Sequence, residues 1–348
     1  MENAMRPIVA SLVWRLPSGI HESQADVVQK LGYRHHFFRF DEPIPSGADI
    51  LLVQGPYGTL LPVVRQLMDY PPERRPVLAY WFQQSLDMRW PEWIHIPLAQ
   101  MFSDLIRYYH QAGWVGNGLH RIAPGFMASK GRRLCFLGDM LWLHRHRLLD
   151  VLALTSTVYA ENLARYGIAS VLVPRGYHPD YGEVRTLQRD IAVVWMGKTR
   201  NKRRRRAVYW LRDQLEKRGQ IMHIYDNEEN PFIFGEERTR ILNRAWFVLN
   251  VFTRPTDELS IRYYIAAANG AVVLTEPGKN KYPFVPGKHL VECPVQEMPD
   301  TVMHYLEHPE EWRSISEEML SLMKSELTLE RSIASILARA ERFLNRRS

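Results

Sequence analysis

The stretch NRAWFVLNVFTRPTDELSIRYYIAAANGAVVLTE, residues 243–276, decides the fold of this chain. Its apolar run 246–251 predicts a buried strand, and a polar loop follows. Ser260 is a good N-cap for a helix that ends at Gly270, and a second apolar strand covers 271–275. Strand, loop, helix and strand in this order form a βαβ unit. The helix then begins at the carboxyl end of a parallel strand, where free backbone N–H groups and the helix dipole favour phosphate.

The rest of the chain alternates short apolar runs with helical patterns. This alternation is typical of α/β proteins with parallel sheets, because parallel strands are joined by crossover helices. Residues 91–146 are the exception, since the irregular order of Trp, Gly and Pro indicates helices mixed with long loops. The other predicted strands are 8–14, 35–40, 50–53, 77–82, 149–154, 170–173, 191–195 and 222–225, and the other predicted helices are 23–31, 60–68, 157–166, 207–218, 238–244, 300–307, 309–322 and 329–345.

Composition places the chain among ordinary globular proteins. Its 348 residues fit two domains of usual size, with 46% hydrophobic and 24% charged residues. No apolar run approaches the roughly 20 residues of a membrane span, and the run 8–14 is too short for a signal peptide. Cys135 and Cys293 are far apart in apolar surroundings, so we expect no disulfide and a cytoplasmic location.

The net charge is +7, and the basic residues are clustered. The longest cluster is KTRNKRRRR at 198–206, with shorter ones at 132–133 and 145–147. A solvated helix start, capture of a diphosphate, an acidic acceptor or peripheral contact with an anionic membrane would each explain such clusters. We expect no nucleic acid partner, because no nucleic-acid motif is present and aromatic residues do not interleave with the basic run.

The stretch that decides the fold also matches a family pattern. The matching residues are Leu249, Asn250, Arg262, Tyr264, Ala266, Ala268 and Gly270. With these residues the segment resembles the donor-site region of GT-B glycosyltransferases with a family-1-type C-terminal domain. The spore-maturation-protein-like group is the most similar one and reads as a strand ending in Leu-Asn, a loop, and R-x-F-E-A-x-A-x-G. The acidic residue of this pattern, which contacts the nucleotide ribose in such enzymes, falls on Ile265, and its partner carboxylate falls on Asp257.

The resemblance implies an α/β protein with the GT-B fold, in which two Rossmann-like domains flank a cleft. An acceptor-side domain would cover 1–182, because the turn residues of PRGYHPDYGE at 174–183 end the first half. A nucleotide-sugar-binding domain would cover 183–325. The C-terminal helix, 326–348, would pack back on the first domain, as in similar enzymes.

The resemblance also implies a donor site on the second domain. Gly197 follows a strand and lets a ligand approach the backbone, and a nearby basic residue would face the donor phosphates. The candidates are Lys198, Arg203 and Arg204. A guanidinium can bind phosphate bidentately and stabilise a leaving nucleoside diphosphate, so we expect Arg203 or Arg204 to contact phosphate.

The helix start completes the predicted donor site. Ser260, Ile261 and Arg262 would bind phosphate, mostly through backbone N–H groups, and Arg262 also matches the family's arginine. Asp257 and Glu258 would accept hydrogen bonds from hydroxyls of the donor sugar. The alternative for both carboxylates is a favourable interaction with the helix dipole.

A catalytic base would come from the first domain. His21 lies in PSGIHES, after the first predicted strand, where some inverting GT-B enzymes place a catalytic histidine. Its imidazole could take a proton from an acceptor hydroxyl. A retaining enzyme needs no such base, and His21 would then position a ligand. Further candidates at strand ends are Gln54, Gly55, Tyr57, Gln83, Gln84, Arg175 and His178.

Other enzyme classes lack their motifs in this sequence. There is no P-loop, no Gly-x-Gly-x-x-Gly, no Gly-x-Ser-x-Gly and no Asp-x-Asp, and His144 and His146 lack a partner set for a metal. We therefore expect a metal-independent glycosyltransferase without a cofactor. It would use a nucleoside-diphosphate sugar and an acceptor that is a glycan, lipid, protein or small molecule. The alternative is a catalytically inactive GT-B scaffold that binds a nucleotide, glycan or protein partner.

Overall fold

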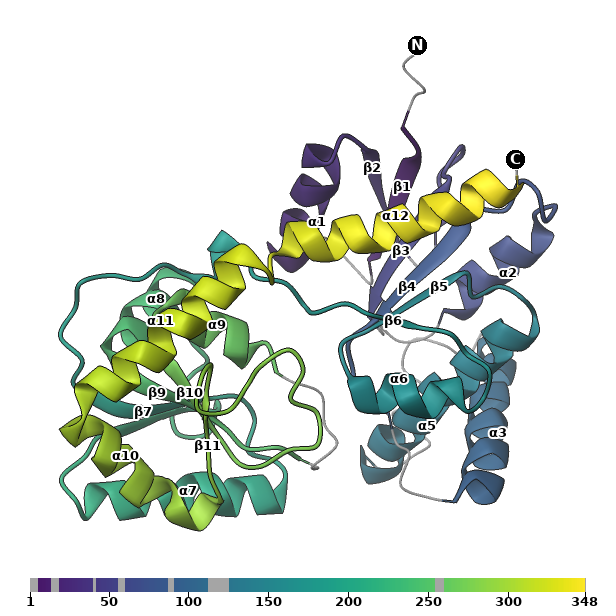
Figure 1. Ribbon diagram of the computed structural model, residues 1–348. Coiled ribbons are helices and arrows are strands. Elements are labelled where there is room, and N and C mark those ends of the chain that lie inside the picture. The colour runs from purple at the N-terminus through teal and green to yellow at the C-terminus, as the bar shows by residue number, and fades with distance from the viewer. Residues whose placement is uncertain are drawn as a thin grey trace. The chain divides into compact units, whose positions relative to one another are not determined.

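A computed structural model describes residues 6–13, 19–39, 42–55, 60–86, 91–111, 125–253 and 260–347, with the side chains of 20, 61–62, 92 and 106–133 left undescribed. The chain divides into two compact units. Unit 1 comprises Met1–Val173 with Ile333–Ser348, and unit 2 comprises Pro174–Ser332. Each unit is built on one sheet (Figure 1).

The sheet of unit 1 has the strand order β2-β1-β3-β4-β5-β6, and each pair of neighbours is parallel. Its central strands are almost completely buried, because they are continuous apolar runs that helices cover on both faces. The strands are β1 (Ile8–Val13), β2 (Arg34–Arg39), β3 (Ile50–Gly55), β4 (Val77–Phe82), β5 (Val151–Leu154) and β6 (Val171–Leu172).

The helices of unit 1 form a layer on each face of this sheet. On one face, Leu51, Val53 and Tyr80 share a core with residues of α2, α3, α5 and α6. Figure 1 shows α1 and α12 on the other face. The helices are α1 (Gly19–Lys30), α2 (Leu61–Asp69), α3 (Glu92–Gln111), α5 (Gly125–Arg145), α6 (Thr157–Ala164) and α12 (Leu329–Arg347).

The sheet of unit 2 has the strand order β11-β10-β9-β7-β8 and is also parallel throughout. Its strands are β7 (Ile191–Met196), β8 (Met222–Tyr225), β9 (Ala245–Asn250), β10 (Val272–Thr275) and β11 (Val291–Glu292). Its helices are α7 (Lys202–Glu216), α8 (Gly235–Arg244), α9 (Arg262–Ala268), α10 (Met298–Glu307) and α11 (Pro309–Ser325), with 3₁₀ turns at Pro179–Tyr181 and Val295–Glu297.

Two separate cores cover the faces of the second sheet. Val194 and Val248 point toward α8, α9 and the end of α11, whereas Val193 and Trp195 point toward α7, α10 and the start of α11. Alternate residues of one strand thus enter different cores, as expected for a strand with two buried faces. The predicted α/β class with two parallel-sheet domains is confirmed.

Residues 174–182, which the sequence analysis assigns to the first domain, lie with unit 2 here. The amide of Tyr177 donates to the Leu327 carbonyl at 2.5 Å, and its carbonyl accepts from the Leu329 amide at 2.8 Å. Asn269 Nδ2 donates to the Tyr181 carbonyl at 3.0 Å. The chain returns to unit 1 within α12, from Ile333 onward.

Among the helix starts that differ from the predicted ones, those of α7 and α9 bear on the predicted donor site. α7 begins at Lys202, five residues before the predicted 207, because Asn201 caps it by accepting a hydrogen bond from the Arg204 amide at 3.0 Å. The basic run therefore forms the first turns of a helix. α9 begins at Arg262 with Ile261 as its N-cap, so the prediction that Ser260 caps this helix was wrong.

Both cysteines, Cys135 and Cys293, are buried free thiols. Among the residues that the structure describes, no helix is both long and apolar enough to cross a bilayer.

Candidate functional site

The carboxyl ends of β7 and β9 form the topological switch point of unit 2. The strand that follows β7, β8, lies on one side of it, and β9 lies on the other. Ligands of open parallel sheets bind outside the carboxyl ends of the strands at such a point. Met196 and Asn250 end these two strands, so their surroundings are the first place to search for a site.

Arg262, the first residue of α9, extends across this switch point. Its Nε donates to the Met196 carbonyl at 2.5 Å, and its Nη1 donates to Asn250 Oδ1 at 3.3 Å. Its Cζ lies 4.5 Å from the centroid of the Trp195 ring, within cation–π range. All these partners are neutral, and within the described ranges no carboxylate forms an ion pair with Arg262.

Among the described residues, none therefore compensates the charge of Arg262. Burial, and then the positive charge of Arg204, lower the pKa of Arg262 to about 9. A lowered pKa of a basic group means that its surroundings disfavour the charged form. An anion bound beside Arg262 would relieve this cost, so the position favours an anionic ligand.

Gly197 makes room for this guanidinium. Its φ of +137° is one that residues with a side chain rarely adopt, and a Cβ there would overlap Arg262 Nη2. Its amide donates to the Tyr225 carbonyl at 2.9 Å, which fixes the end of β7 against β8. The sequence singles out both Gly197 and Arg262, and the structure places them in contact. The group that approaches the glycine is the protein's own arginine.

Arg204 brings a second guanidinium to the same place. Its Nε donates to the Val251 carbonyl at 3.0 Å, and its Cζ lies 5.7 Å from the centroid of Trp195. Since its charge lowers the pKa of Arg262, the two cations are near enough to repel each other. Two guanidiniums beside one indole ring provide the charge that a diphosphate needs.

Arg203 points to a different partner. It forms an ion pair with Glu276, in which the Nη1–Oε1 distance is 3.0 Å, and it also donates to the Phe252 carbonyl at 2.8 Å. Glu276 is buried and accepts a further hydrogen bond from the Phe252 amide at 2.6 Å. Hydrogen bonding to Glu276 raises the pKa of Arg203. Arg203 thus connects α7 to the loops after β9 and β10.

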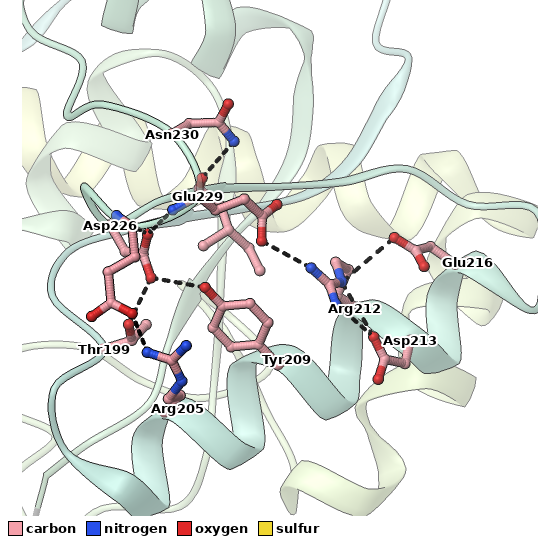
Figure 2. Close-up of polar contacts among 11 residues, drawn as sticks. Thr199, Arg205, Tyr209, Arg212, Asp213, Glu216, Asp226, Glu229 and Asn230 are labelled. Atoms are coloured by element: carbon pink, nitrogen blue, oxygen red, sulfur yellow. Dashed lines mark hydrogen bonds and ion pairs between the residues drawn. The ribbon is translucent and has the colours of Figure 1, made fainter.

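Thr199, before α7, and side chains of α7 itself hold the loop after β8. Figure 2 shows Thr199 Oγ1 and Tyr209 Oη donating to Asp226 Oδ2, at 2.6 and 3.1 Å. Hydrogen bonding from Thr199 and from backbone amides lowers the pKa of Asp226 in spite of its burial. The ion pairs of this region are Arg205–Glu228, Arg212–Asp213, Arg212–Glu216 and Arg212–Glu229. Within the basic run, Arg203 and Arg205 thus have acidic partners.

The residues at the start of α9 hold the Arg262 side chain in place, and the Arg262 amide is itself already hydrogen-bonded. Ser260 Oγ accepts from the Arg262 amide at 3.2 Å and lies 3.3 Å from Arg262 Nη1, so it fixes the arginine at both ends. Ile261 is the N-cap, and α9 has only seven residues. Lys198 is exposed at the end of β7. Asp257 and Glu258 lie outside the described residues.

Ile265 lies in the hydrophobic core of unit 2. It is 7% exposed and belongs to the cluster that contains Tyr263, Tyr264 and Ala266. The family's acidic position is thus occupied by a core residue in this chain. Its side chain packs with apolar neighbours, which explains why an apolar residue is stable there.

Unit 1 has neutral polar residues near the carboxyl edge of its sheet. Its switch point lies between β1 and β3, because β2 and β3 flank β1. His21 is the third residue of α1, and Gln24 follows one turn later. His21, Gln24 and Gln54, at the end of β3, are 7%, 2% and 4% exposed. Gln24 Nε2 and Gln54 Oε1 have no hydrogen-bond partner within the described ranges, which suits a site for a polar ligand or water.

The remaining candidates are divided between the units. In unit 1, Gly55 and Gln83 are buried and Gln84 is exposed, whereas Tyr57 lies outside the described residues. Arg175 and His178 belong to unit 2. His178 forms an ion pair with Asp180, with Nδ1 3.1 Å from Oδ2, and caps the turn Pro179–Tyr181.

One group of potential metal ligands occurs among the described residues, outside the site above. His308, Glu310 and Glu311 place one ligand atom each within 4.8 Å of one another, and all three are exposed. His144 and His146 are exposed at the end of α5, where His146 stacks on Trp142 with ring centroids 3.8 Å apart.

Sequence reasoning missed three residues that build the site in unit 2. Trp195 supports both guanidiniums, Asn250 orients Arg262, and Glu276 holds Arg203. Asn250 was part of the family pattern, and its position at a strand end could have identified it. The contacts of Trp195 and Glu276 depend on how strands and loops meet, so no local signal identifies them.

Residues 192–338 match the family model described as "Glycosyl transferase-like". No curated protein matches the chain. Among solved structures, sucrose-phosphate synthase from Thermosynechococcus elongatus is similar with a TM-score of 0.61 and 12% identity, over 99% of this chain and all of the other. HepE of Anabaena, solved with UDP-glucose, has a TM-score of 0.52 and 10% identity, over 98% of this chain and all of HepE. TarM has a TM-score of 0.55 and 7% identity over 84% of this chain. The chain spans about half of the length of TarM (54%).

These similarities confirm the GT-B fold and the resemblance to glycosyltransferases with this type of C-terminal domain. They do not distinguish the spore-maturation-protein-like group from others. At 7–12% identity the solved structures establish the fold, and the family match concerns the part of the chain, residues 192–338, that contains Arg262 and Gly197.

Proposed function

We propose that this chain, a GT-B protein whose residues 192–338 match a glycosyl transferase-like family, transfers a sugar from a nucleoside-diphosphate sugar to an acceptor. The observation that carries the proposal is Arg262, a guanidinium at the switch point of the second sheet whose partners in the described part of the chain are all neutral. The similar protein HepE was solved once with UDP-glucose and once with UDP and glucose. A uridine nucleotide is therefore the first donor to test.

Arg262 and Arg204 are the proposed ligands of the diphosphate. Glycosyl transfer breaks the bond between the sugar carbon and the phosphate oxygen, and negative charge grows on the leaving diphosphate. A fixed cation that is already desolvated stabilises this charge more in the transition state than in the ground state. Trp195, Asn250 and Ser260 hold the guanidinium of Arg262 in place, so little reorganisation is needed.

Arg203 has a supporting role in this proposal. Its ion pair with Glu276 and its hydrogen bond to the Phe252 carbonyl fix the first turn of α7, which also carries Arg204. Lys198, exposed beside Gly197, could reach the outer phosphate oxygens without a fixed position.

Unit 1 would bind the acceptor. The buried His21, Gln24 and Gln54 are neutral or weakly basic groups that suit hydroxyls better than phosphates. His21 is the proposed base for an inverting reaction. The proposed chemistry needs no metal, because two arginines supply the charge that a divalent cation would otherwise bring to the diphosphate.

A nucleotide panel tests the donor site. UDP, GDP, ADP and the corresponding sugars are added at millimolar concentration to the wild-type chain and to Arg262→Gln. We expect one nucleoside diphosphate to raise the melting temperature of the wild type. Loss of a charge-assisted contact should weaken its affinity roughly tenfold to a hundredfold in Arg262→Gln. Arg218→Gln is the matched control, because Arg218 is an arginine of the same unit whose partner is the exposed Asp300.

The same panel separates the arginines of the basic run. The double variant Arg203→Ala with Arg204→Ala should also weaken the shift, and Arg204→Ala alone should account for most of the loss. No shift with any nucleotide would refute the donor site. A shift without release of free nucleoside diphosphate from any sugar nucleotide and acceptor would favour the inactive scaffold.

A further inference from the structure

Helix α3 of unit 1 has several large apolar side chains on the outside. Its buried positions His95, Ala99 and Ser103 recur every four residues and face α5. Ser103 and α5 pack closely, since a Cβ at Gly138 would lie 2.7 Å from the Ser103 Cβ. This inner stripe is composed of small and polar residues, so the contact with α5 is made by close packing of backbones.

The opposite stripe of α3 is apolar and exposed. It consists of Trp93, Pro97, Met101 and Leu105, which also recur every four residues and are offset by two positions from the inner stripe. Two positions correspond to about 200° around a helix, so the two stripes lie on opposite faces. Trp93, Met101 and Leu105 are 76%, 53% and 41% exposed. An aligned apolar stripe of this length on a helix surface marks a binding face.

The segment that carries this stripe is strongly basic. Residues 91–147 contain seven Arg or Lys residues and three Asp or Glu residues, a net charge of +4 out of +7 for the whole chain. Arg145 and Arg147 are exposed at the end of α5. Arg145 lies against α3: with the Gln100 amide oxygen turned toward it, the guanidinium donates to that oxygen at 2.6 and 3.0 Å.

We propose that the outer stripe of α3 inserts into the surface of an anionic lipid bilayer. An apolar stripe with a tryptophan, on a segment whose sequence is rich in Arg and Lys, has the composition of a helix that lies in the membrane interface. The indole of Trp93 would enter the headgroup region, and the basic residues would attract anionic lipids. Contact with a membrane surface would place unit 1 where a lipid-linked acceptor is found, but it does not depend on the donor site.

The charge of the segment favours a bilayer over a second copy of the chain. Two copies that met through this stripe would bring two segments of +4 together, and like charges across an interface cost binding energy. An anionic surface gains energy from the same charge.

Vesicle binding of the full chain tests this proposal. The chain is sedimented with vesicles of phosphatidylcholine that contain one third phosphatidylglycerol, and with vesicles of phosphatidylcholine alone. We expect binding to the first and much weaker binding to the second, with a loss of binding at high salt. Trp93→Ser with Met101→Ser should lower the partition coefficient by roughly tenfold or more.

Phe234→Ser is the matched control, since Phe234 is 71% exposed and lies in unit 2. It removes a comparable aromatic surface and should leave vesicle binding unchanged. Because Trp93 and Met101 are exposed, the double variant should keep the wild-type melting temperature. Equal binding of the two variants, or no binding of the wild type to anionic vesicles, would refute the proposal. Self-association that only the α3 variant abolishes, without vesicle binding, would assign the stripe to an interface between copies.

Discussion

The two parallel sheets of this chain have similar architecture but opposite chemistry at their carboxyl edges. At the switch point of unit 2, Arg262 and Arg204 lie beside Trp195. Near the switch point of unit 1, the buried polar groups include His21 and the uncharged amides of Gln24 and Gln54. The strand topology fixes where a ligand can bind in each unit. The side chains at that place decide which ligand it can be.

The two edges also differ in what their buried polar groups lack. The Arg262 guanidinium has hydrogen-bond partners but no counter-charge among the described residues, so an anion would complete it. Gln24 and Gln54 each leave one amide atom without a hydrogen-bond partner in the described part of the chain, so a hydroxyl would complete them. A donor with a diphosphate and an acceptor with hydroxyls would match these two edges.

A carboxylate at position 265 of unit 2 has the largest expected effect, and it tests whether this position faces the ligand or the core. If position 265 faced the nucleotide, Ile265→Glu would restore the family's ribose contact and strengthen binding. Its burial predicts instead that a carboxylate in the core lowers the free energy of unfolding by about 3 kcal/mol or more. Thermal and urea unfolding measure the loss. Ile265→Val, expected to cost about 1 kcal/mol, is the control. An unchanged stability with tighter nucleotide binding would show that position 265 faces the ligand.

Gly197→Ala should disturb the cationic edge itself. The alanine methyl would overlap Arg262 Nη2 at a φ of +137°, and we expect a loss of about 2 kcal/mol in stability together with weaker nucleotide binding. Gly219→Ala is the control, because Gly219 also has a positive φ, +73°, but no atom within 4 Å of the new methyl. It should lose some stability and keep nucleotide affinity. Equal effects of both variants on affinity would mean that Gly197 does not position Arg262.

Arg203→Ala should separate structural from binding arginines. It leaves the buried Glu276 with its bond from the Phe252 amide but without its cation, and we expect a loss of about 1–2 kcal/mol, limited by the exposure of Arg203. Nucleotide affinity should change by less than about threefold, since the phosphate ligands remain. The measurement is a melting curve with a nucleotide titration. A loss of affinity as large as that of Arg262→Gln would assign Arg203 to the phosphate.

The smallest expected effect concerns the edge of unit 1. Gln54→Leu removes an amide whose Oε1 has no hydrogen-bond partner within the described ranges, so we expect a gain of about 0.5–1 kcal/mol in stability. Urea unfolding measures it, with Gln54→Ala as a control that creates a cavity and loses stability. A loss of stability in Gln54→Leu would mean that water or an undescribed residue already satisfies this amide.

Much of the fold was predictable because its signals are local. The apolar run at 246–251 and the small residues of 266–268 predicted a strand and a helix of unit 2, and the structure has both, as β9 and α9. The start of α7 was missed because Asn201 was not recognised as its cap. The hydrogen bond from Arg204 overrides the high charge density of the helix's first turns.

Candidate site residues were harder to predict. Gly197 and Arg262 could be singled out from a strand end and a family pattern. The sequence of the basic run does not distinguish its arginines from one another. Their partners, such as Glu276 and Glu228, come from other elements. Their roles therefore depend on tertiary contacts that no spacing within the run encodes.

The sequence by itself determined the class of fold, two parallel sheets with crossover helices, because hydrophobic periodicity and turn residues act over a few neighbouring positions. Only the tertiary structure decided that Arg262 has no counter-charge among the described residues and that Ile265 belongs to the core. It also decided that the apolar face of α3 is the outer one. These properties depend on which distant side chains meet, and that is set when helices pack on sheets.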